Sequence, residues 1–515
     1  MKGIIMRLKE ILSDDIKALV FGDLNVDVLG ISYDSRIVQD CYAFFSLPGH
    51  NTDGSKYIGE AIKKGSSVII SPSKVDVGSA TLVVVEDIFR FMSIFSARFY
   101  NYPDRELSVI GITGTNGKTT IAYMIESILS HVGIDCGVIG TINYRHKGAI
   151  IEAPNTTPQA PDVYRIMREM LDGRVKHIVM EVSSHALRLG RVYGIDFDIA
   201  VFTNLTQDHL DFHKTMDNYF EAKSSLFRSL GTGIKKNRKY AIINIDDKYG
   251  KKLAEIDLNA EKKLYSISEK SKADFKAENI DIASSGSKFD LACNGEISKI
   301  KIKHFGLHNV YNALAALACT VCCNVNFDKA IEGLNKAKEA PGRLQRVDTG
   351  RLGFEILVDY AHTDDALKNV LDAIKKIKHK RLITVFGCGG DRDRTKRPIM
   401  GKTAVEMSDF VFVTSDNPRT EDPNLIILDI EAGIKKTYRA NYKVVVDRDE
   451  AIKEAIMMAG KGDIILLAGK GHETYQVIGL DKIHFSDIDT AEKYIDLRES
   501  RKNTSSEPEQ EEFNF

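Results

Sequence analysis

The stretch "GITGTNGKTT" at residues 111–120 constrains the fold of this chain more than any other feature. It follows "ELSVI" (106–110), which is typical of a short buried strand, and it precedes apolar residues at helical spacing. Those apolar residues are Ile121, Met124, Ile125, Ile128, Leu129 and Val132. Glycine frees backbone N–H groups at the positive end of a helix dipole, and Lys118 adds a full charge. The sequence therefore predicts a strand, a loop that holds a nucleotide phosphate, and a helix.

The loop departs from the common phosphate-loop pattern at one position. The pattern G-x-x-x-x-G-K-[ST] needs glycine at position 112, where this chain has Ile112, and Gly111 is displaced by one residue. An ordinary glycine-rich turn is the alternative interpretation. The order of strand, loop, Gly-Lys-Thr and amphipathic helix favours a phosphate site.

Length and composition narrow the class of protein. The 515 residues exceed what one core supports and suggest about three domains. A formal net charge of -1 gives no reason to expect a nucleic-acid partner. The seven cysteines lack zinc-site spacing, and no apolar run reaches the ~20 residues that span a bilayer. We expect a reduced, cytoplasmic, monomeric protein that binds small molecules, without membrane insertion or a signal peptide.

Short apolar runs that alternate with helical stretches predict an α/β fold in three domains. The predicted boundaries are 1–105, 106–339 and 340–498, followed by a polar, acidic and disordered tail at 499–515. The runs are "YAFFSLPG", "SVIIS" and "TLVVVED" in the first domain; "HIVMEVSS", "FDIAVFTNL" and "KYAIINID" in the second; and "FEILVDYAH", "RLITVFGCGGDRD", "DFVFVTSDNPR" and "DIILLAGKGHE" in the third. Polar residues end these runs, at the strand ends where parallel sheets collect ligands.

Several strand ends in the second domain carry metal-binding side chains. Glu181 could take a magnesium ion together with Thr119, and His209 follows the next strand. A lone histidine there is more often a packed or capping residue. Together the three residues predict two metal ions around phosphate oxygens. Lys223, on the following helix, has no feature that separates it from a solvated lysine.

Four polar loops in the third domain predict a site for a small zwitterion or anion. Arg419, in a loop held rigid by Pro418 and Pro423, presents a planar fork that fits a carboxylate. A surface ion pair to Glu421 or Asp422 is the alternative.

The same residues carry a family resemblance. In chain order the motifs are "GITGTNGKTT", "NTTP", "MEVSSHAL", "NLTQDHLDFH", "EAKSSLF", "GLHNVYNALAA", "PGRLQ", "VDYAHTDDAL", "GCGGDRDRTKRP", "DNPRTEDP" and "AGKGHETYQ". The chain resembles the Mur ligases from about Tyr33 to Tyr475. The resemblance implies an N-terminal α/β domain for a UDP sugar, a central phosphate-loop ATPase with a mostly parallel sheet, and a C-terminal Rossmann-like domain for an amino acid. Members usually have proline at the position of Asp364.

The resemblance also implies roles for single residues. UDP-muramoyl-peptide contacts fall on Ser35, Arg36, His50, Asn51, Thr156, Thr157, Ser183 and Arg191. ATP contacts fall on Gly114, Thr115, Asn116, Gly117, Lys118, Thr119, Thr120, His308, Asn309 and Arg343. The metal ligands are Thr119, Glu181 and His209, for Mg²⁺, and the catalytic residues are Lys118, Lys223, His209, Glu181 and His362. Lys223 corresponds to a lysine that relatives carry as a carbamate (N6-carboxylysine), and Asp359 lies with His362 where the ATP and acceptor sites join.

The implied reaction is ATP-dependent amide formation in cytoplasmic peptidoglycan precursor synthesis, on a UDP-muramoyl dipeptide. We predict meso-diaminopimelate as the acceptor, because Arg419 offers a fork for its second carboxylate. The other acceptor residues are Arg392, Asp416, Asn417, Pro418, Gly469 and Glu473. The alternatives are L-lysine as acceptor, a folylpolyglutamate synthase, another peptide ligase of the cyanophycin type, and a nucleotide-binding switch without catalysis.

Overall fold

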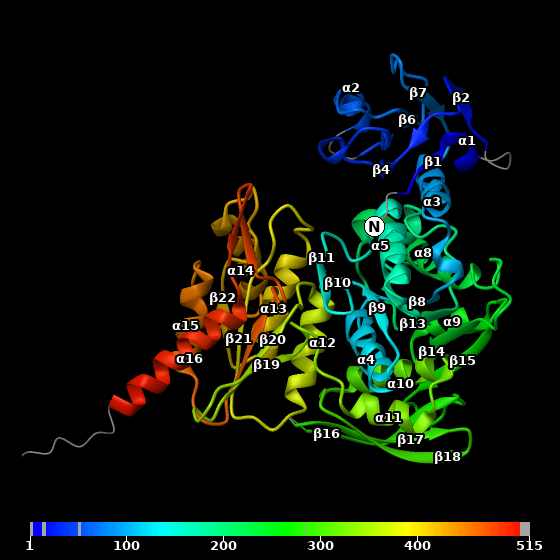
Figure 1. Ribbon diagram of the computed structural model, residues 1–515. Coiled ribbons are helices and arrows are strands. Elements are labelled where there is room, and N and C mark those ends of the chain that lie inside the picture. The colour runs from blue at the N-terminus through cyan, green and yellow to red at the C-terminus, as the bar shows by residue number, and fades with distance from the viewer. Residues whose placement is uncertain (1–3, 13–16, 50–52, 284, 505–515) are drawn as a thin grey trace, which may run out of the picture. The chain divides into compact units, whose positions relative to one another are not determined.

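The computed structural model describes residues 4–12, 17–49, 53–283 and 285–504 (Figure 1). The chain forms two compact units. The first comprises the residues up to Leu205, His213–Lys276 and Ala313–Leu334. The second comprises Thr206–Phe212, Ala277–Asn312 and the residues from Asn335 onward. None of the helices in these described ranges is both long and apolar enough to cross a membrane.

The N-terminal part of the first unit holds a five-stranded sheet. Its order is β2 (Leu19–Phe21), β7 (Thr81–Val84), β6 (Val68–Ser71), β5 (Tyr42–Phe45) and β4 (Gly30–Ser32). All neighbours are parallel except β2 and β7. The three apolar runs predicted as strands in this region are β5, β6 and β7. Between β5 and β6 lie the helical turn η2 (Gly54–Tyr57) and the helix α2 (Ile58–Lys63). The helix α3 (Ile88–Phe99) follows, with Phe91, Met92 and Phe95 buried.

A parallel sheet forms the centre of the first unit. Side by side lie β9 (Cys136–Ile139), β12 (His177–Glu181), β8 (Ser108–Thr113), β13 (Ile199–Phe202), β14 (Tyr240–Asn244) and β15 (Glu261–Ser266). Glu181 pairs with Ile112, and Phe202 pairs with Thr113. The carboxyl ends of β8, β12 and β13 therefore meet at one edge. The predicted strand, loop and helix around residues 111–120 are confirmed as β8 and α4 (Lys118–His131).

The second unit contains a six-stranded sheet of the doubly wound type. Its order is β19 (Gln345–Val347), β20 (Glu355–Asp359), β24 (Ile464–Ala468), β21 (Leu382–Phe386), β22 (Phe410–Val413) and β23 (Tyr442–Val444), and only β19 is antiparallel. One core cluster joins this sheet to α12 (Asp364–Lys375), α13 (Lys396–Met407) and α14 (Pro423–Lys435). Another joins it to α15 (Arg448–Met458) and α16 (Asp487–Thr504). The predicted α/β class, with mostly parallel sheets, is confirmed.

Some elements depart from the predictions. The antiparallel pairs β10 (Asn143–His146) with β11 (Ala149–Glu152), β17 (Gly286–Cys293) with β18 (Glu296–Ile302), and β25 (Tyr475–Ile478) with β26 (Asp481–His484) were not expected. The tail predicted to be disordered starts at residue 499, but α16 continues to Thr504. The predicted start of the tail is therefore wrong. Residues 499–504 are helical because they continue a helix that packs on the sheet through Ala491, Tyr494 and Ile495. The rest of that tail lies outside the described residues.

The remaining helices connect these strands. In the first unit the remaining α-helices are α1 (Leu8–Ile11), α5 (Ala160–Asp172), α6 (Ser184–Arg188), α8 (Met216–Arg228), α9 (Lys248–Glu255) and α11 (Phe327–Asn335). The last of these ends at the first residue of the second unit. Two further helices involve both parts of the chain: α7 (Leu210–His213) and α10 (Leu307–Cys322).

Candidate active site

The phosphate loop between β8 and α4 is held in shape by the end of β13. The backbone N–H of Thr115 donates to the Asn204 carbonyl at 2.9 Å, and the N–H of Asn116 donates to the Asn204 side chain at 3.0 Å. Gly114 adopts φ 146°, and a Cβ there would collide with the Thr203 hydroxyl, so only glycine fits. Gly117 caps α4 with φ 90°. The loop is thus fixed with its backbone at a helix N-terminus, as an anion site requires.

Two lysines converge on this loop. Lys118 Nζ donates to the carbonyls of Gly114 at 2.9 Å and Thr115 at 2.8 Å. Lys223 Nζ, from α8, donates to the same Gly114 carbonyl at 2.8 Å. Lys223 is 1% exposed and lies over the Tyr219 ring, so it is not the solvated lysine that was the alternative. The structure therefore places Lys223, whose carboxylation is only a prediction, at the phosphate loop.

The Glu181 carboxylate lies at the edge of the sheet beside the loop. It accepts from the Thr119 hydroxyl at 2.9 Å, from the Thr141 hydroxyl at 3.0 Å and from the Thr141 N–H at 3.0 Å. Thr119 and Glu181, predicted as metal ligands, are in direct contact. Thr141 was missed, because a single threonine after a strand carries no motif signal. Gly140 leaves room for the carboxylate, since a Cβ there would fall on Glu181 Oε1.

His209 belongs to the second unit. It has a positive φ of 53° and lies 3.3 Å from the neighbouring Asp208 carboxylate. Its segment is tied to α12 by the Thr206 hydroxyl, which donates to Asp365 at 2.7 Å. No group of three or more His, Cys, Asp or Glu side chains suited to a metal ion occurs among the described residues. A metal role for His209 stays a prediction from the family motif.

The residues predicted to hold the muramoyl peptide form one cluster. Thr157, fully buried, donates to the Glu181 carbonyl at 2.8 Å and contacts the Ser183 hydroxyl at 3.3 Å. Thr156 contacts Thr141 at 3.1 Å through their hydroxyls. Arg191 donates through Nη1 to the Thr157 carbonyl at 2.8 Å. This group therefore lies directly beside the Glu181 carboxylate.

Arg191 has an unusual environment for a cation. Burial lowers the pKa of its guanidinium, and its Nε is buried without a hydrogen bond. No carboxylate lies within ion-pair distance of it in the described part of the chain, and the groups that influence its pKa electrostatically are the neutral Tyr33 and Tyr144 hydroxyls. A half-buried arginine with a buried, unbonded Nε is normally matched by an acid, so this position is suited to a carboxylate or phosphate from a ligand.

The predicted uridine diphosphate residues lie in the N-terminal part. Ser35 is buried and donates to Glu60 at 2.7 Å. Arg36 is exposed and grips its neighbour Asp34 through Nε and Nη2 at 2.9 and 2.7 Å. His50 and Asn51 lie outside the described residues.

Near the start of α10, two of the predicted ATP contacts differ in exposure. His308 is exposed, whereas Asn309 is buried and uses its amide to donate to the Phe305 carbonyl at 2.8 Å. Arg343 lies over the ring of Tyr360, 5.0 Å from its centroid. Asp359 accepts from the N–H groups of Leu344 at 2.7 Å and Ala361 at 2.8 Å, and burial raises its pKa.

His362 lies beside this group. Its ring packs on Tyr360 with centroids 4.5 Å apart, and its carbonyl accepts from Lys396 Nζ at 2.7 Å. Asp364, where the family usually has proline, starts α12 directly after the Thr363 cap. The loop that carries His362 is therefore followed by a regular helix.

In the acceptor domain, three polar residues after β22 and β24 meet around a lysine that the sequence analysis missed. Lys470 Nζ lies 3.5 Å from Asp416 Oδ1, 3.1 Å from Asn417 Oδ1 and 3.3 Å from Glu473 Oε2. The Asn417 amide also donates to Glu473 at 2.9 Å. The Lys470 side chain is fully buried, and burial raises the pKa of Glu473. The sequence analysis gave Lys470 no role, because its three partners meet only through tertiary packing.

Arg419 does not form the surface ion pair that was its alternative. Its Nη1 donates to the Gly390 carbonyl at 2.7 Å, and its half-buried side chain has no acid within ion-pair distance in the described chain. Glu421 instead pairs with the fully buried Arg397 at 2.8 Å, and Asp422 caps α14. The guanidinium keeps donors for a ligand.

The remaining acceptor residues frame this loop. Arg392 is exposed and donates to the Asp391 carbonyl at 3.0 Å. A Cβ at Gly390 would fall on the Pro418 carbonyl oxygen, and one at Gly469 (φ 116°) would lie 3.0 Å from Asp416 Oδ2. The loops after β21, β22 and β24 are therefore packed together.

Comparison with known proteins identifies the family. Family models for the Mur ligase middle domain, the Mur ligase glutamate ligase domain and the Mur ligase family catalytic domain match residues 112–320, 342–471 and 27–97. The UDP-N-acetylmuramoyl-L-alanyl-D-glutamate--2,6-diaminopimelate ligase 1 of Clostridium acetobutylicum is 46% identical over 494 residues, covering 95% of this chain and 99% of that protein. The chain belongs to the Mur ligase family. A diaminopimelate ligase of Fusobacterium nucleatum is 43% identical to this Mur ligase over 499 residues, with 95% and 99% covered.

Solved structures agree with this assignment. A UDP-N-acetylmuramoyl-L-alanyl-D-glutamate--2,6-diaminopimelate ligase matches this Mur ligase with a TM-score of 0.67 and 32% identity, over 96% of this chain and 99% of that one. A folylpolyglutamate synthase of Mycobacterium tuberculosis shares the fold, with a TM-score of 0.59 and 17% identity over 73% of this chain and 92% of that one. The match to the synthase leaves about a quarter of this Mur ligase uncovered.

Proposed function

We propose that this Mur ligase uses ATP to join meso-diaminopimelate to the D-glutamate γ-carboxylate of UDP-N-acetylmuramoyl-L-alanyl-D-glutamate. The observation that carries the proposal is similarity to ligases named for this reaction over almost their whole length. Arg419 supports the choice of acceptor, because its guanidinium has no acidic partner among the described residues. Diaminopimelate ends in a second carboxylate that a planar fork can bind, and lysine does not.

ATP makes the amide bond possible by activating the carboxylate. In the proposed reaction the γ-carboxylate attacks the γ-phosphate of ATP, giving an acyl phosphate and ADP. The neutral amine of the acceptor then attacks the acyl carbon, and phosphate leaves as the amide forms. Both steps need the reacting groups held together and water kept away from the acyl phosphate.

The phosphate loop supplies the electrostatic part of this chemistry. Its N–H groups and Lys118 stabilise the negative charge that gathers on the transferring phosphoryl group. Lys118 now rests on the carbonyls of Gly114 and Thr115, so we expect it to turn from them to the nucleotide when ATP binds. Arg191, beside Thr157, is placed to hold a carboxylate or phosphate of the muramoyl substrate.

Mg²⁺ is part of the proposal because the donor set suits it. The Thr119 hydroxyl and the Glu181 carboxylate are hard oxygen donors 2.9 Å apart beside the phosphate loop. Bound Mg²⁺ neutralises phosphate charge. A second ion, with His209 as a ligand, and a carbamate on Lys223 remain predictions from the family motifs. Lys223 contacts the Gly114 carbonyl, so a carbamate on this lysine would lie beside the phosphate loop.

Phosphate release tests the function directly. The assay contains ATP, magnesium and UDP-N-acetylmuramoyl-L-alanyl-D-glutamate, with meso-diaminopimelate or L-lysine as acceptor. We expect turnover that depends on diaminopimelate. Turnover with lysine alone keeps the ligase but contradicts the role given to Arg419. Failure with both acceptors, in protein that binds ATP, contradicts the proposed function.

A further inference from the structure

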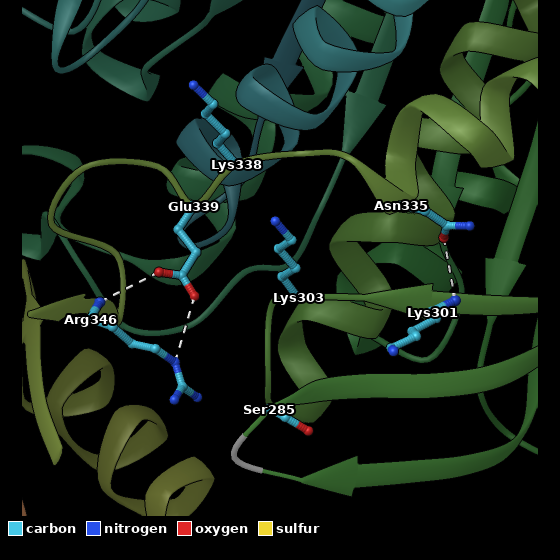
Figure 2. Close-up of a pocket in the computed structure, with 7 residues that line it drawn as sticks. All are labelled: Ser285, Lys301, Lys303, Asn335, Lys338, Glu339 and Arg346. Atoms are coloured by element: carbon cyan, nitrogen blue, oxygen red, sulfur yellow. Dashed lines mark hydrogen bonds and ion pairs between the residues drawn. The ribbon is translucent and has the colours of Figure 1, made fainter. Parts of the chain in front are cut away.

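A second concave site lies in the second unit, away from the residues discussed above. It is a cavity of about 740 Å³ lined by Ser285, Lys301, Lys303, Asn335, Lys338, Glu339 and Arg346 (Figure 2). Ser285 precedes β17, and the two neighbouring lysines come from β18 and the residue after it. Asn335 ends α11, and Arg346 comes from β19. Three separate chain segments therefore contribute to one pocket.

The pocket has more positive charge than its own acid can balance. Arg346 is partly neutralised, because its Nη1 donates to Glu355 at 2.9 Å and its Nε lies 4.0 Å from Glu339 Oε1. By contrast, Lys301 and Lys303 have no carboxylate within ion-pair distance in the described part of the chain. Glu339 is the single acid of the lining, and its carboxylate faces Arg346 (Figure 2). Cations gathered in a concave site repel one another unless an anion enters.

The lining also offers hydrogen-bond donors that the protein does not use. Arg346 Nη2 is buried without a hydrogen bond among the described residues. The Asn335 side-chain oxygen accepts a hydrogen bond from the Lys301 N–H at 3.3 Å. The amide nitrogen of the same side chain can therefore donate to a ligand. Ser285 adds an exposed hydroxyl. Donors and ammonium groups together suit phosphate oxygens, which only accept.

We propose that this pocket binds a small polyphosphate anion at a site separate from the ATP phosphate loop. Several cations spread over a cavity of about 740 Å³ match a ligand with more than one phosphate better than a single small ion. The ligand would touch the β17–β18 hairpin, the segment after α11 and β19 at once, and would stabilise their packing.

Calorimetric titration with inorganic pyrophosphate tests the proposal. The full-length Lys118→Ala variant is the background, because it weakens phosphate binding at the ATP loop. We expect one site whose affinity falls at least about tenfold in Lys301→Ala/Lys303→Ala, since two charge-assisted contacts are lost. Lys299→Ala, which removes an exposed lysine of the same strand outside the pocket, is the matched control and leaves the affinity unchanged.

A variant that is expected to bind pyrophosphate more tightly excludes misfolding as the cause of weaker binding. Glu339→Gln removes the competing acid beside Arg346, so we expect pyrophosphate to bind about threefold or more tightly. Rising salt weakens binding to the parent pocket. Ligase activity of Lys301→Ala/Lys303→Ala, measured with Lys118 intact, stays at the parental level.

Other phosphate compounds identify the source of the ligand. ADP that binds with the same dependence on Lys301 and Lys303 indicates a nucleotide, and pyrophosphate alone indicates an inorganic ligand. AMP, with one phosphate, is expected to bind at least about tenfold more weakly. The proposal is overturned if pyrophosphate binding vanishes in Lys118→Ala alone, if it is unchanged in Lys301→Ala/Lys303→Ala, or if AMP binds as tightly.

Discussion

Arginines in this protein fall into two groups by their partners. Arg397 pairs with Glu421 and Asp429, and Arg448 makes two bonds of 2.7 Å to Asp487, so these buried cations are matched within the fold. Arg191 and Arg419 have no acid nearby among the described residues and lie beside polar loops. Because a partly desolvated cation without an acidic partner costs free energy, these two half-buried positions are where a ligand anion is expected.

Replacing Arg419 tests this interpretation at the acceptor site. We expect Arg419→Ala to raise the KM for diaminopimelate about 10- to 100-fold, because a bidentate carboxylate contact is lost. The KM for ATP should not change. Arg394→Ala is the matched control, since Arg394 is exposed and pairs with Asp429. Equal effects of the two substitutions in steady-state kinetics would contradict the assignment.

Lys223 is a second residue whose burial predicts function. Lys223→Met keeps the length of the side chain but can neither donate to Gly114 nor form a carbamate. We expect a loss of kcat of about a hundredfold or more, with normal folding by circular dichroism. Lys248→Met, on the next helix, is the control. Carbon-13 NMR after equilibration with labelled bicarbonate then shows whether Lys223 of the parent protein is carboxylated, by a signal that the variant lacks.

At the scale of elements, close helix packing in the second unit depends on a glycine. A Cβ at Gly433 of α14 would fall on the Pro398 carbonyl of α13. Gly433→Ala should therefore push the helices apart and lower the free energy of unfolding by about 1–3 kcal/mol. Gly59→Ala in α2, where a Cβ meets nothing within 4 Å, should instead stabilise by about 0.5–1 kcal/mol. Denaturant unfolding measures the change in unfolding free energy for both variants. If both substitutions stabilise the protein, or both destabilise it, the argument is refuted.

The loop after β22 is tied to α13 by a charge that depends on pH. The buried guanidinium of Arg397 lowers the pKa of Glu421 from 4.5 to about 2. A lowered pKa means that the stabilisation is fully present above pH 4.5 and is lost as the pH falls towards 2. Glu421→Gln should therefore lie below the parent protein in unfolding free energy at neutral pH, and the gap should narrow between pH 4.5 and 2. A gap that does not depend on pH would exclude the ion pair as its cause.

The sequence predicts the parallel strands well, for a physical reason. Strands such as β21 and β24 are buried on both faces, so they appear as unbroken apolar runs that end in polar residues. The missed hairpins have exposed faces. In β18, lysines alternate with Ile300 and Ile302, and such short alternation is easily taken for a polar loop. The phosphate loop was predictable because its motif is local.

Side chains brought together from distant segments were predicted less completely. Family motifs placed Glu181 and Asn417, but nothing local indicated that Thr141 would hold the first or that Lys470 would hold the second. Thr141 lies in no motif, and Lys470 lies in the motif "AGKGHETYQ", in which only Gly469 and Glu473 were given a role. These contacts depend on which strands are neighbours in the sheet, and a single sequence does not show that order.

For the whole molecule, the predicted phosphate-loop residues and the predicted acceptor residues belong to different units. The phosphate loop and the muramoyl cluster belong to the first unit, and the Asp416–Arg419 loop belongs to the second. We therefore expect Lys118→Ala to lose stabilisation by ATP but to keep stabilisation by diaminopimelate, and Arg419→Ala to show the reverse. Thermal unfolding with each ligand measures this, with about 2.7 kcal/mol expected at a ligand concentration of a hundred times Kd. Loss of both responses in either variant would show that the sites do not bind independently.

The order of segments within the units has a consequence for recombination between relatives. The chain passes from one unit to the other after residues 205, 212, 276, 312 and 334. No single crossover in the gene can exchange a complete unit. A chimera joined at residue 334 would take residues 206–212 and 277–312 of its second unit from the wrong parent. Inheritance of an intact second unit from one parent therefore requires five crossovers, which favours descent of the gene as one block.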